Sequence, residues 1–155
     1  SEEWLERSAE TWGEVLKSSE ARLYLENTCD QSPVPILRLL KLLPEDRAFM
    51  CFDVGHWHCA ADGWRKNNLA EWIAPIAASG RLGHLHLHDN DGSGDRHLGM
   101  GQGSINYHLF FDLMKKHGQK VNFTLEAHKS ESLERSLSWL ANDPAGRDFA
   151  SISER

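Results

Sequence analysis

The sequence lacks a long apolar segment and a run of basic residues. Its longest apolar stretch, residues 36–43, is interrupted by Arg38 and Lys41, so it is too short to cross a bilayer. The N-terminal Ser-Glu-Glu-Trp also lacks the basic-then-apolar order of a signal peptide. The formal net charge of -6 argues against a nucleic-acid surface, because phosphate binding normally needs a basic stripe. We therefore expect neither a membrane nor a nucleic-acid partner.

Cysteine is also scarce. The three cysteines, Cys29, Cys51 and Cys59, are odd in number and form no CxxC pair, which argues against a disulfide framework. A reduced protein of the cytoplasm is the simplest interpretation. At 155 residues the chain can bury a single core, and we expect residues 1–142 to form the folded unit and residues 143–155 a polar tail.

Apolar periodicity predicts alternating helices and strands. Strands are expected over residues 22–27, 48–53, 84–88 and 121–126, and helices over 3–19, 36–43, 65–79, 109–114 and 133–140. Regular alternation of this kind is typical of an α/β fold in which helical crossovers join parallel strands.

Each predicted strand carries a potential metal ligand at or near its C-terminal end. In a (β/α)8 barrel, the active site is built at that end of the strands. An oxygen-rich set with one imidazole suits Mn2+, Mg2+ or Co2+, and Zn2+ is possible because of the histidine. A single acid at a strand end is often only a helix cap, so the repetition over four successive strands carries the prediction. The four residues are Glu26, Asp53, His86 and Glu126.

The third strand is rich in histidine. Alternation places His84, His86 and His88 on one face, with leucines on the other. A surface strand with chance histidines is the alternative. We expect His84 to lie deeper along the strand and His88 beyond its end, so only His86 is counted as a metal ligand.

The following loop has two interpretations. Asp95 and His97 could hold a second metal together with His56, which follows Asp53 by three residues. Equally, His56 and Arg96 could contact substrate oxygens, and Trp57 could wall the pocket. The glycine-rich residues 99–103 lack the spacing of a dinucleotide loop, so a turn leading into a helix is expected.

The order and spacing of short motifs between residues 20 and 140 resemble the second half of the xylose-isomerase-like barrels, also called AP endonuclease family 2. This family includes sugar isomerases and epimerases, inosose-processing enzymes and endonuclease IV. The resemblance implies TIM-barrel-type β/α repeats forming about half a (β/α)8 barrel, strands five to eight. The motifs are Glu26-Asn27, Asp53-Val-Gly-His56, His86-Leu-His-Asp89, Asp95-Arg-His97, Gly101-Gln-Gly103 and Leu125-Glu126.

By this resemblance, the four strand-end residues would bind a divalent metal. Glu26 and Glu126 would also move a proton through an enediolate of a sugar or sugar phosphate. His56 and Arg96 fall where sugar epimerases contact substrate, whereas His56, Asp95 and His97 fall where endonuclease IV holds an additional zinc. Gln102 stands where many relatives have glutamate, which leaves any charge-dependent role of that position in doubt.

The resemblance therefore implies that the intact parent is a metal-dependent isomerase or epimerase. A zinc-dependent phosphodiesterase similar to endonuclease IV and a non-catalytic half-barrel fragment are the alternatives. Whether this chain alone is active is left open. A full barrel needs about 250 residues, and half of one would have open edges. We therefore expect the chain to self-associate or to be completed by an N-terminal segment.

Overall fold

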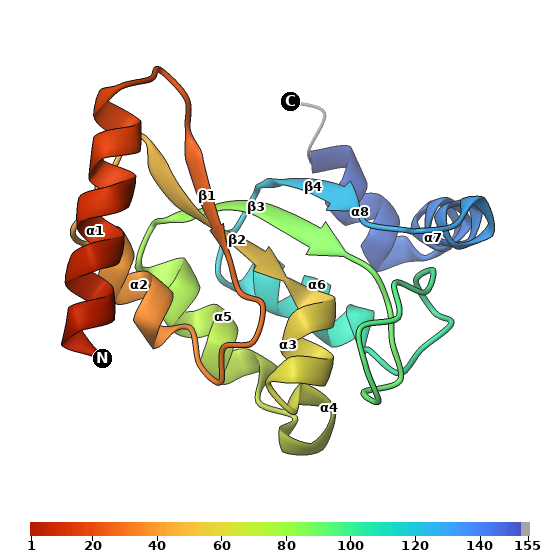
Figure 1. Cartoon of the computed structure of the whole chain (residues 1–155). Coiled ribbons are helices and arrows are strands. Elements are labelled where there is room, and N and C mark those ends of the chain that lie inside the picture. Colours follow the sequence, from red (N-terminus) through yellow and green to blue (C-terminus); the bar gives the residue numbers. More distant parts are fainter. Residues whose placement is uncertain (153–155) are drawn as a thin grey trace.

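The computed structural model describes residues 1–152, which form a parallel sheet covered by helices (Figure 1). The four strands pair in chain order, β1-β2-β3-β4, and every pairing is parallel. This arrangement confirms the predicted α/β class and corresponds to part of a barrel wall. The strands are β1 (Leu23–Glu26), β2 (Ala48–Asp53), β3 (Leu82–Leu87) and β4 (Asn122–Leu125).

Helices connect the strands and follow the last one. Figure 1 shows α5 and α6 below the sheet, and α1 and α7 on opposite sides of the molecule. Helix α1 has the predicted N-terminal position, and Asn106 caps α6 by accepting a hydrogen bond from the Leu109 N–H. The helices are α1 (Glu2–Lys17), α2 (Val34–Leu40), α3 (Val54–Ala60), α4 (Gly63–Lys66), α5 (Leu69–Ala78), α6 (Tyr107–Lys116), α7 (Ser130–Asn142) and α8 (Pro144–Ile152).

The two faces of the sheet differ in polarity. Met50, Phe52 and Leu85 are completely buried on the helix-covered face. The opposite face carries Tyr24, which is 42% exposed and stacks on Phe49. Because side chains alternate along a strand, the strand-end acids and His86 belong to this open face.

Two segments differ from the prediction. Residues 54–64, for which no helix or strand was predicted, contain α3 and the first half of α4. The Asp53 side chain caps the N-terminus of α3 by accepting a hydrogen bond from the His56 N–H. The expected polar tail contains α8, in which Phe149 is buried and stacks on Phe111. The remaining part of that tail, residues 153–155, lies outside the described residues. The polar-tail prediction is therefore wrong for residues 144–152.

Helix α7 also packs differently from the leucine pattern. Leu133 and Leu137 are exposed, whereas Ser132 and Ser136 are buried. The Ser136 hydroxyl accepts a hydrogen bond from the Met100 N–H at 3.0 Å. The small face of α7 therefore packs against the glycine-rich loop after β3.

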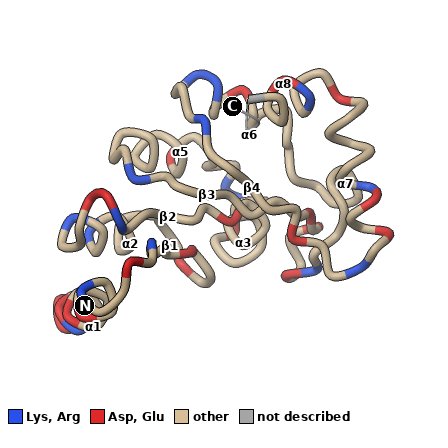
Figure 2. The backbone as a smooth tube through the Cα atoms, turned by 90° about the horizontal axis from the view of Figure 1, so that it is seen from above, with Lys and Arg blue, Asp and Glu red and all other residues tan. Residues whose placement is uncertain are grey.

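Charge is distributed without a basic stripe over the part of the chain that the structure describes. Figure 2 shows lysine and arginine scattered over separate elements, with acidic residues on α1 and in loops. Among the helices of residues 1–152, none combines the length and the apolar character that crossing a bilayer requires.

Candidate metal centre

The structure brings the four predicted metal ligands together. One potential ligand atom from each of them lies within 4.8 Å of those of the other three. The ends of three neighbouring strands supply Glu26, Asp53 and His86, and Glu126 directly follows β4. We call this group, Glu26, Asp53, His86 and Glu126, the strand-end cluster.

The strand-end cluster contains buried polar atoms that lack partners. The Nδ1 atom of His86 lies 3.2 Å from Glu126 Oε2 and 3.6 Å from Asp53 Oδ2. Among the described residues, none of these three atoms makes a hydrogen bond of acceptable geometry. Buried polar atoms normally have hydrogen-bond partners, so three buried atoms without such partners that converge on one point fit the binding of a cation. The donor set of three carboxylates and one imidazole matches a hard divalent ion.

The protonation states follow from the excess of carboxylates. The Asp53 carboxylate raises the pKa of His86 to about 11. Burial would raise the pKa of Asp53, but the nearby His86 ring and the hydrogen bond with His88 outweigh it and hold that pKa below its usual value. Burial and the nearby Asp53 together raise the pKa of Glu126. The cluster therefore attracts positive charge.

Asn27 and the start of α3 hold Asp53 in place. The Asn27 amide donates to the Asp53 carbonyl and accepts from the Asp53 N–H, both at 2.9 Å, which joins the ends of β1 and β2. Asp53 Oδ1 accepts the His56 N–H at 2.6 Å, so Oδ2 is left for the cluster. The sequence placed Asn27 in a motif but did not indicate this role.

A second group of potential ligands lies next to the first. Its members are His56, His88, Asp95 and His97, again with one potential ligand atom each within 4.8 Å of the others. We call this group the loop cluster. It contains all three residues predicted for a second metal, together with His88, which the sequence analysis left out. The alternation of His84, His86 and His88 was the signal that could have identified it.

The other two residues predicted to contact substrate, Trp57 and Arg96, have partners within the protein. Trp57 was expected to wall the pocket, but it is only 4% exposed in the core, and its Nε1 donates to Asn68 Oδ1. The Arg96 side chain is 57% exposed and forms an ion pair with Asp91 at 3.3 Å. Trp57 therefore packs in the core, and Arg96 forms an ion pair at the surface.

The loop after β3 is folded around Asp89. This buried carboxylate accepts the N–H groups of Gly101 and Ile105, at 2.9 and 3.2 Å. Residues 99–103 therefore form a turn before α6, as predicted. Gln102 accepts the Gly99 N–H at 2.9 Å and thereby takes part in the same turn.

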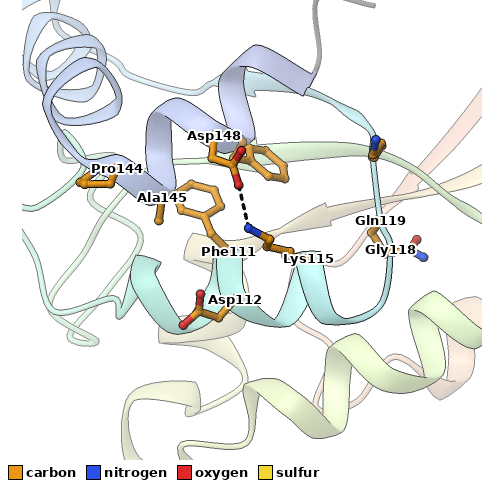
Figure 3. A pocket seen from close by; sticks show the side chains of 10 residues that line it. Phe111, Asp112, Lys115, Gly118, Gln119, Pro144, Ala145 and Asp148 are labelled. Atoms are coloured by element: carbon orange, nitrogen blue, oxygen red, sulfur yellow. Dashed lines mark hydrogen bonds and ion pairs between the residues drawn. The ribbon is translucent and has the colours of Figure 1, made fainter.

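Cavities lie beside both clusters and also far from them. A cavity of about 550 Å³ between α1 and α2 reaches Glu26, and another of about 330 Å³ lies next to His56 and Asp95. A cavity of about 470 Å³ lies between α6 and α8, where Lys115 and Asp148 pair at 3.1 Å (Figure 3). This last cavity contains none of the predicted site residues.

Comparison with known proteins places this arrangement in a family. The model of the xylose isomerase-like TIM barrel family matches residues 1–143. The protein MJ1311 of Methanocaldococcus jannaschii, described as uncharacterized, is 29% identical over 96 residues, which are 61% of this chain and 31% of that protein.

Solved structures share the fold. A D-tagatose 3-epimerase-like protein has a TM-score of 0.75 at 23% identity, covering 97% of this chain and 55% of its own. The TTHB071 protein from Thermus thermophilus, in a structure obtained by soaking with ZnCl2, has a TM-score of 0.64 at 26% identity, with the same coverage. This chain spans about half the length of these solved relatives. Its sheet matches half a barrel, and the chain belongs to the xylose isomerase-like TIM barrel family.

Proposed function

We propose that the intact protein is a divalent-metal-dependent isomerase or epimerase acting on a sugar or sugar phosphate. The observation that carries this proposal is the convergence of Asp53 Oδ2, His86 Nδ1 and Glu126 Oε2, all buried and without partners among the described residues. The likeness to a D-tagatose 3-epimerase-like protein supports a sugar as the substrate class.

The strand-end cluster would hold Mn2+, Mg2+, Co2+ or Zn2+ through all four of its residues. A bound ion supplies polarisation of the substrate carbonyl and its neighbouring hydroxyl, which acidifies the C–H between them. Asp53 is suited to holding rather than to proton transfer, because it is completely buried and its other oxygen caps α3. His86 is likewise surrounded by carboxylates on the neighbouring strands.

Glu26 and Glu126 are the proposed proton-transfer residues. Glu26 ends β1 and Glu126 directly follows β4. Because β1 and β4 are the two outermost strands of the sheet, the two carboxylates approach the centre from opposite sides. One carboxylate would remove the proton next to the carbonyl and keep it, and the other, in its protonated form, would deliver its own proton to the opposite face of the enediolate. His56 Nδ1 lies 3.0 Å from Glu26 Oε1 and can orient that carboxylate or a substrate oxygen. A substrate contact by Arg96 stays a prediction.

The test follows solvent deuterium entering a panel of ketoses, inososes and their phosphates in the presence of Mn2+. Glu126→Gln should reduce exchange by at least about 100-fold, because it removes a general acid–base group. Glu131→Gln, at an exposed position on α7, is the matched control and should leave exchange unchanged. Chelation of the metal should abolish exchange, and added Mn2+ should restore it. Equal exchange by the two variants would contradict the proposal.

A second candidate is a zinc-dependent phosphodiesterase similar to endonuclease IV. The proximity of His56, Asp95 and His97 favours it, whereas the net charge of -6 disfavours a DNA substrate. Cleavage of abasic DNA without any deuterium exchange would reverse the ranking. A chain that binds no metal and catalyses neither reaction would instead be a non-catalytic half-barrel.

We also propose that the sheet is completed by a second copy or by an N-terminal segment, because β1 and β4 each have one neighbour in the described residues. A reducing, cytoplasmic location is proposed because Cys29, Cys51 and Cys59 are all unpaired.

A further inference from the structure

We propose that Cys29 and Cys59 form a dithiol pair, which a low-molecular-weight disulfide such as oxidised glutathione converts reversibly into an intramolecular disulfide. The bond would join the loop after β1 to the end of α3, beside the cavity of about 330 Å³ that both cysteines line. The dithiol pair itself is independent of the proposed isomerase. Only its expected effect on deuterium exchange rests on the proposed function.

Both cysteines line the same cavity. The loop after β1 contributes Cys29 to this cavity and α3 contributes Cys59, together with His56. Cys29 is exposed and Cys59 is partly buried, and both are free thiols in the structure. Residues three apart share a face of a helix, so Cys59 lies on the same side of α3 as His56. A reagent in the cavity can therefore meet the exposed thiol first, with the second thiol on the same wall.

Contacts on both sides of the cysteines hold the loop against α3. The Asn27 carbonyl oxygen lies 3.0 Å from His56 Nδ1. Four residues further along each segment, the Gln31 amide donates to the Ala60 carbonyl at 2.7 Å. Each cysteine lies between the two fixed points of its own segment. The two thiol-bearing segments therefore run side by side and are linked at both ends.

Both segments have backbone that can adjust to a disulfide, which needs Cα atoms about 4.4–6.8 Å apart. Residues 27–33 form neither helix nor strand. Cys59 belongs to the last turn of α3, where the carbonyls of a helix have no partners within the helix. Small shifts at these positions leave β1, β2 and the body of α3 in place.

The third cysteine lacks these properties. Cys51 is only 3% exposed and lies within β2, where it is paired in register with Glu26 of β1. A glutathione molecule has no access to a thiol that is buried in this way. Cys51 therefore serves as an internal control for any reaction at the other two cysteines.

The reaction is a thiol–disulfide exchange in two steps. The Cys29 thiolate attacks one sulfur of oxidised glutathione, which forms a mixed disulfide and releases one glutathione thiolate. The Cys59 thiolate then attacks the Cys29 sulfur and releases the second glutathione thiolate. Two electrons pass from the protein to glutathione, and the two released thiolates take up the two protons that the cysteines have lost. Dithiothreitol reverses the reaction.

The disulfide would restrain a proposed catalytic group. Cys29 follows Glu26 by three residues, and His56 Nδ1, on the helix that carries Cys59, lies 3.0 Å from Glu26 Oε1. A bond between these two segments would fix Glu26 and reduce the access of substrate through the cavity. We expect oxidation to lower deuterium exchange by at least about 10-fold, because small displacements of a catalytic group are costly.

The experiment incubates the purified chain in glutathione buffers of increasing oxidised fraction. Free thiols are then blocked and counted, and linked peptides are identified by mass spectrometry. The wild-type chain should lose two of its three thiols and the mass of two hydrogen atoms, with Cys29 linked to Cys59. Cys51→Ala is the matched control and should lose the same two thiols. Cys59→Ser should instead carry one glutathione on Cys29, because the second step then lacks its thiol.

A wild-type chain that stops at this glutathione adduct would overturn the proposal, as would a disulfide that joins two chains through Cys29. Deuterium exchange by Cys29→Ser should be the same in reducing and oxidising buffers. A wild-type disulfide form that exchanges deuterium as fast as the reduced chain would overturn the effect on Glu26. A reduced chain that forms the disulfide but shows no exchange with any sugar would contradict the isomerase and support the dithiol pair.

Discussion

At the scale of single residues, Gly55 is the position where one methyl group matters most for the loop cluster. Gly55→Ala should lower the free energy of unfolding by about 1–3 kcal/mol, because the added Cβ overlaps the buried His88 ring. Urea unfolding followed by circular dichroism measures this change. Gly13→Ala in α1 is the control, since its new Cβ would meet nothing within 4 Å apart from its chain neighbours and the backbone of its own helix. That variant should gain about 0.5–1 kcal/mol from helix propensity. A Gly55→Ala protein as stable as the wild type would refute the close approach.

The buried His58 should make the free energy of unfolding depend on pH. Burial lowers its pKa from 6.5 to about 4, and its Nε2 lies 2.9 Å from the Ser104 hydroxyl. The unfolded chain therefore binds more protons than the folded one between these values, so the free energy of unfolding falls as the pH drops from 6.5 towards 4. His58→Gln should flatten this slope in urea unfolding at a series of pH values. Ser104→Ala keeps the ring and should keep the slope, and an unchanged slope in His58→Gln would show that other groups cause it.

The candidate ligands differ in how far the sequence revealed them. Glu26, Asp53 and Glu126 could be predicted because parallel strands align their ends at one edge of the sheet. His88 was left out because it lies just beyond the last residue of β3, although the alternation of the strand still places its side chain beside the site. Trp57 was misplaced because residues 54–60 form a helix, in which neighbours point about 100° apart, so Trp57 enters the core beside His56.

At the scale of elements, α8 shows why a short polar helix is hard to recognise in a sequence. Its nine residues are too few to form a stable helix alone, and such helices depend on tertiary packing. Phe149 supplies that packing by stacking on Phe111 at 4.7 Å. The contact joins residues far apart in the sequence, so local periodicity could not indicate it.

Phe149→Ala should therefore lower the free energy of unfolding by about 3 kcal/mol, because it removes a buried aromatic ring. Ser151→Ala, at an exposed position on the same helix, should change it by less than about 0.5 kcal/mol. Chemical denaturation of both variants gives the comparison. Equal stabilities would mean that α8 contributes nothing to the folded chain.

At the scale of the whole molecule, the sheet has two unused edges in the described residues. The Leu23 N–H donates to Arg47 O on the β2 side, so the N–H of the following Tyr24 points away from β2. The cavity of about 550 Å³ between α1 and α2 lies beside this edge. An added strand would find both hydrogen-bonding groups and space at β1.

If a second copy uses the β1 edge, Tyr24→Pro should shift the chain towards monomer in sedimentation velocity experiments, because proline has no N–H to donate. Tyr24→Ala is the matched control, since it removes the same ring and keeps the N–H. It should sediment like the wild type. A wild-type chain that is monomeric at every concentration, and that keeps its structure on dilution, would contradict self-association.

Asp53 has a consequence for energetic coupling across the molecule. Its Oδ2 belongs to the strand-end cluster, while its Oδ1 contacts both the start of α3 and the His88 ring. The Asp53 carboxylate is therefore in direct contact with both the strand-end cluster and the loop cluster. A substitution in one cluster should therefore affect the other cluster, and the free-energy changes of two such substitutions should not add in a double-mutant cycle. By thermodynamic reciprocity, a ligand bound at either cluster would change the affinity of the other cluster for its own ligand by the same factor.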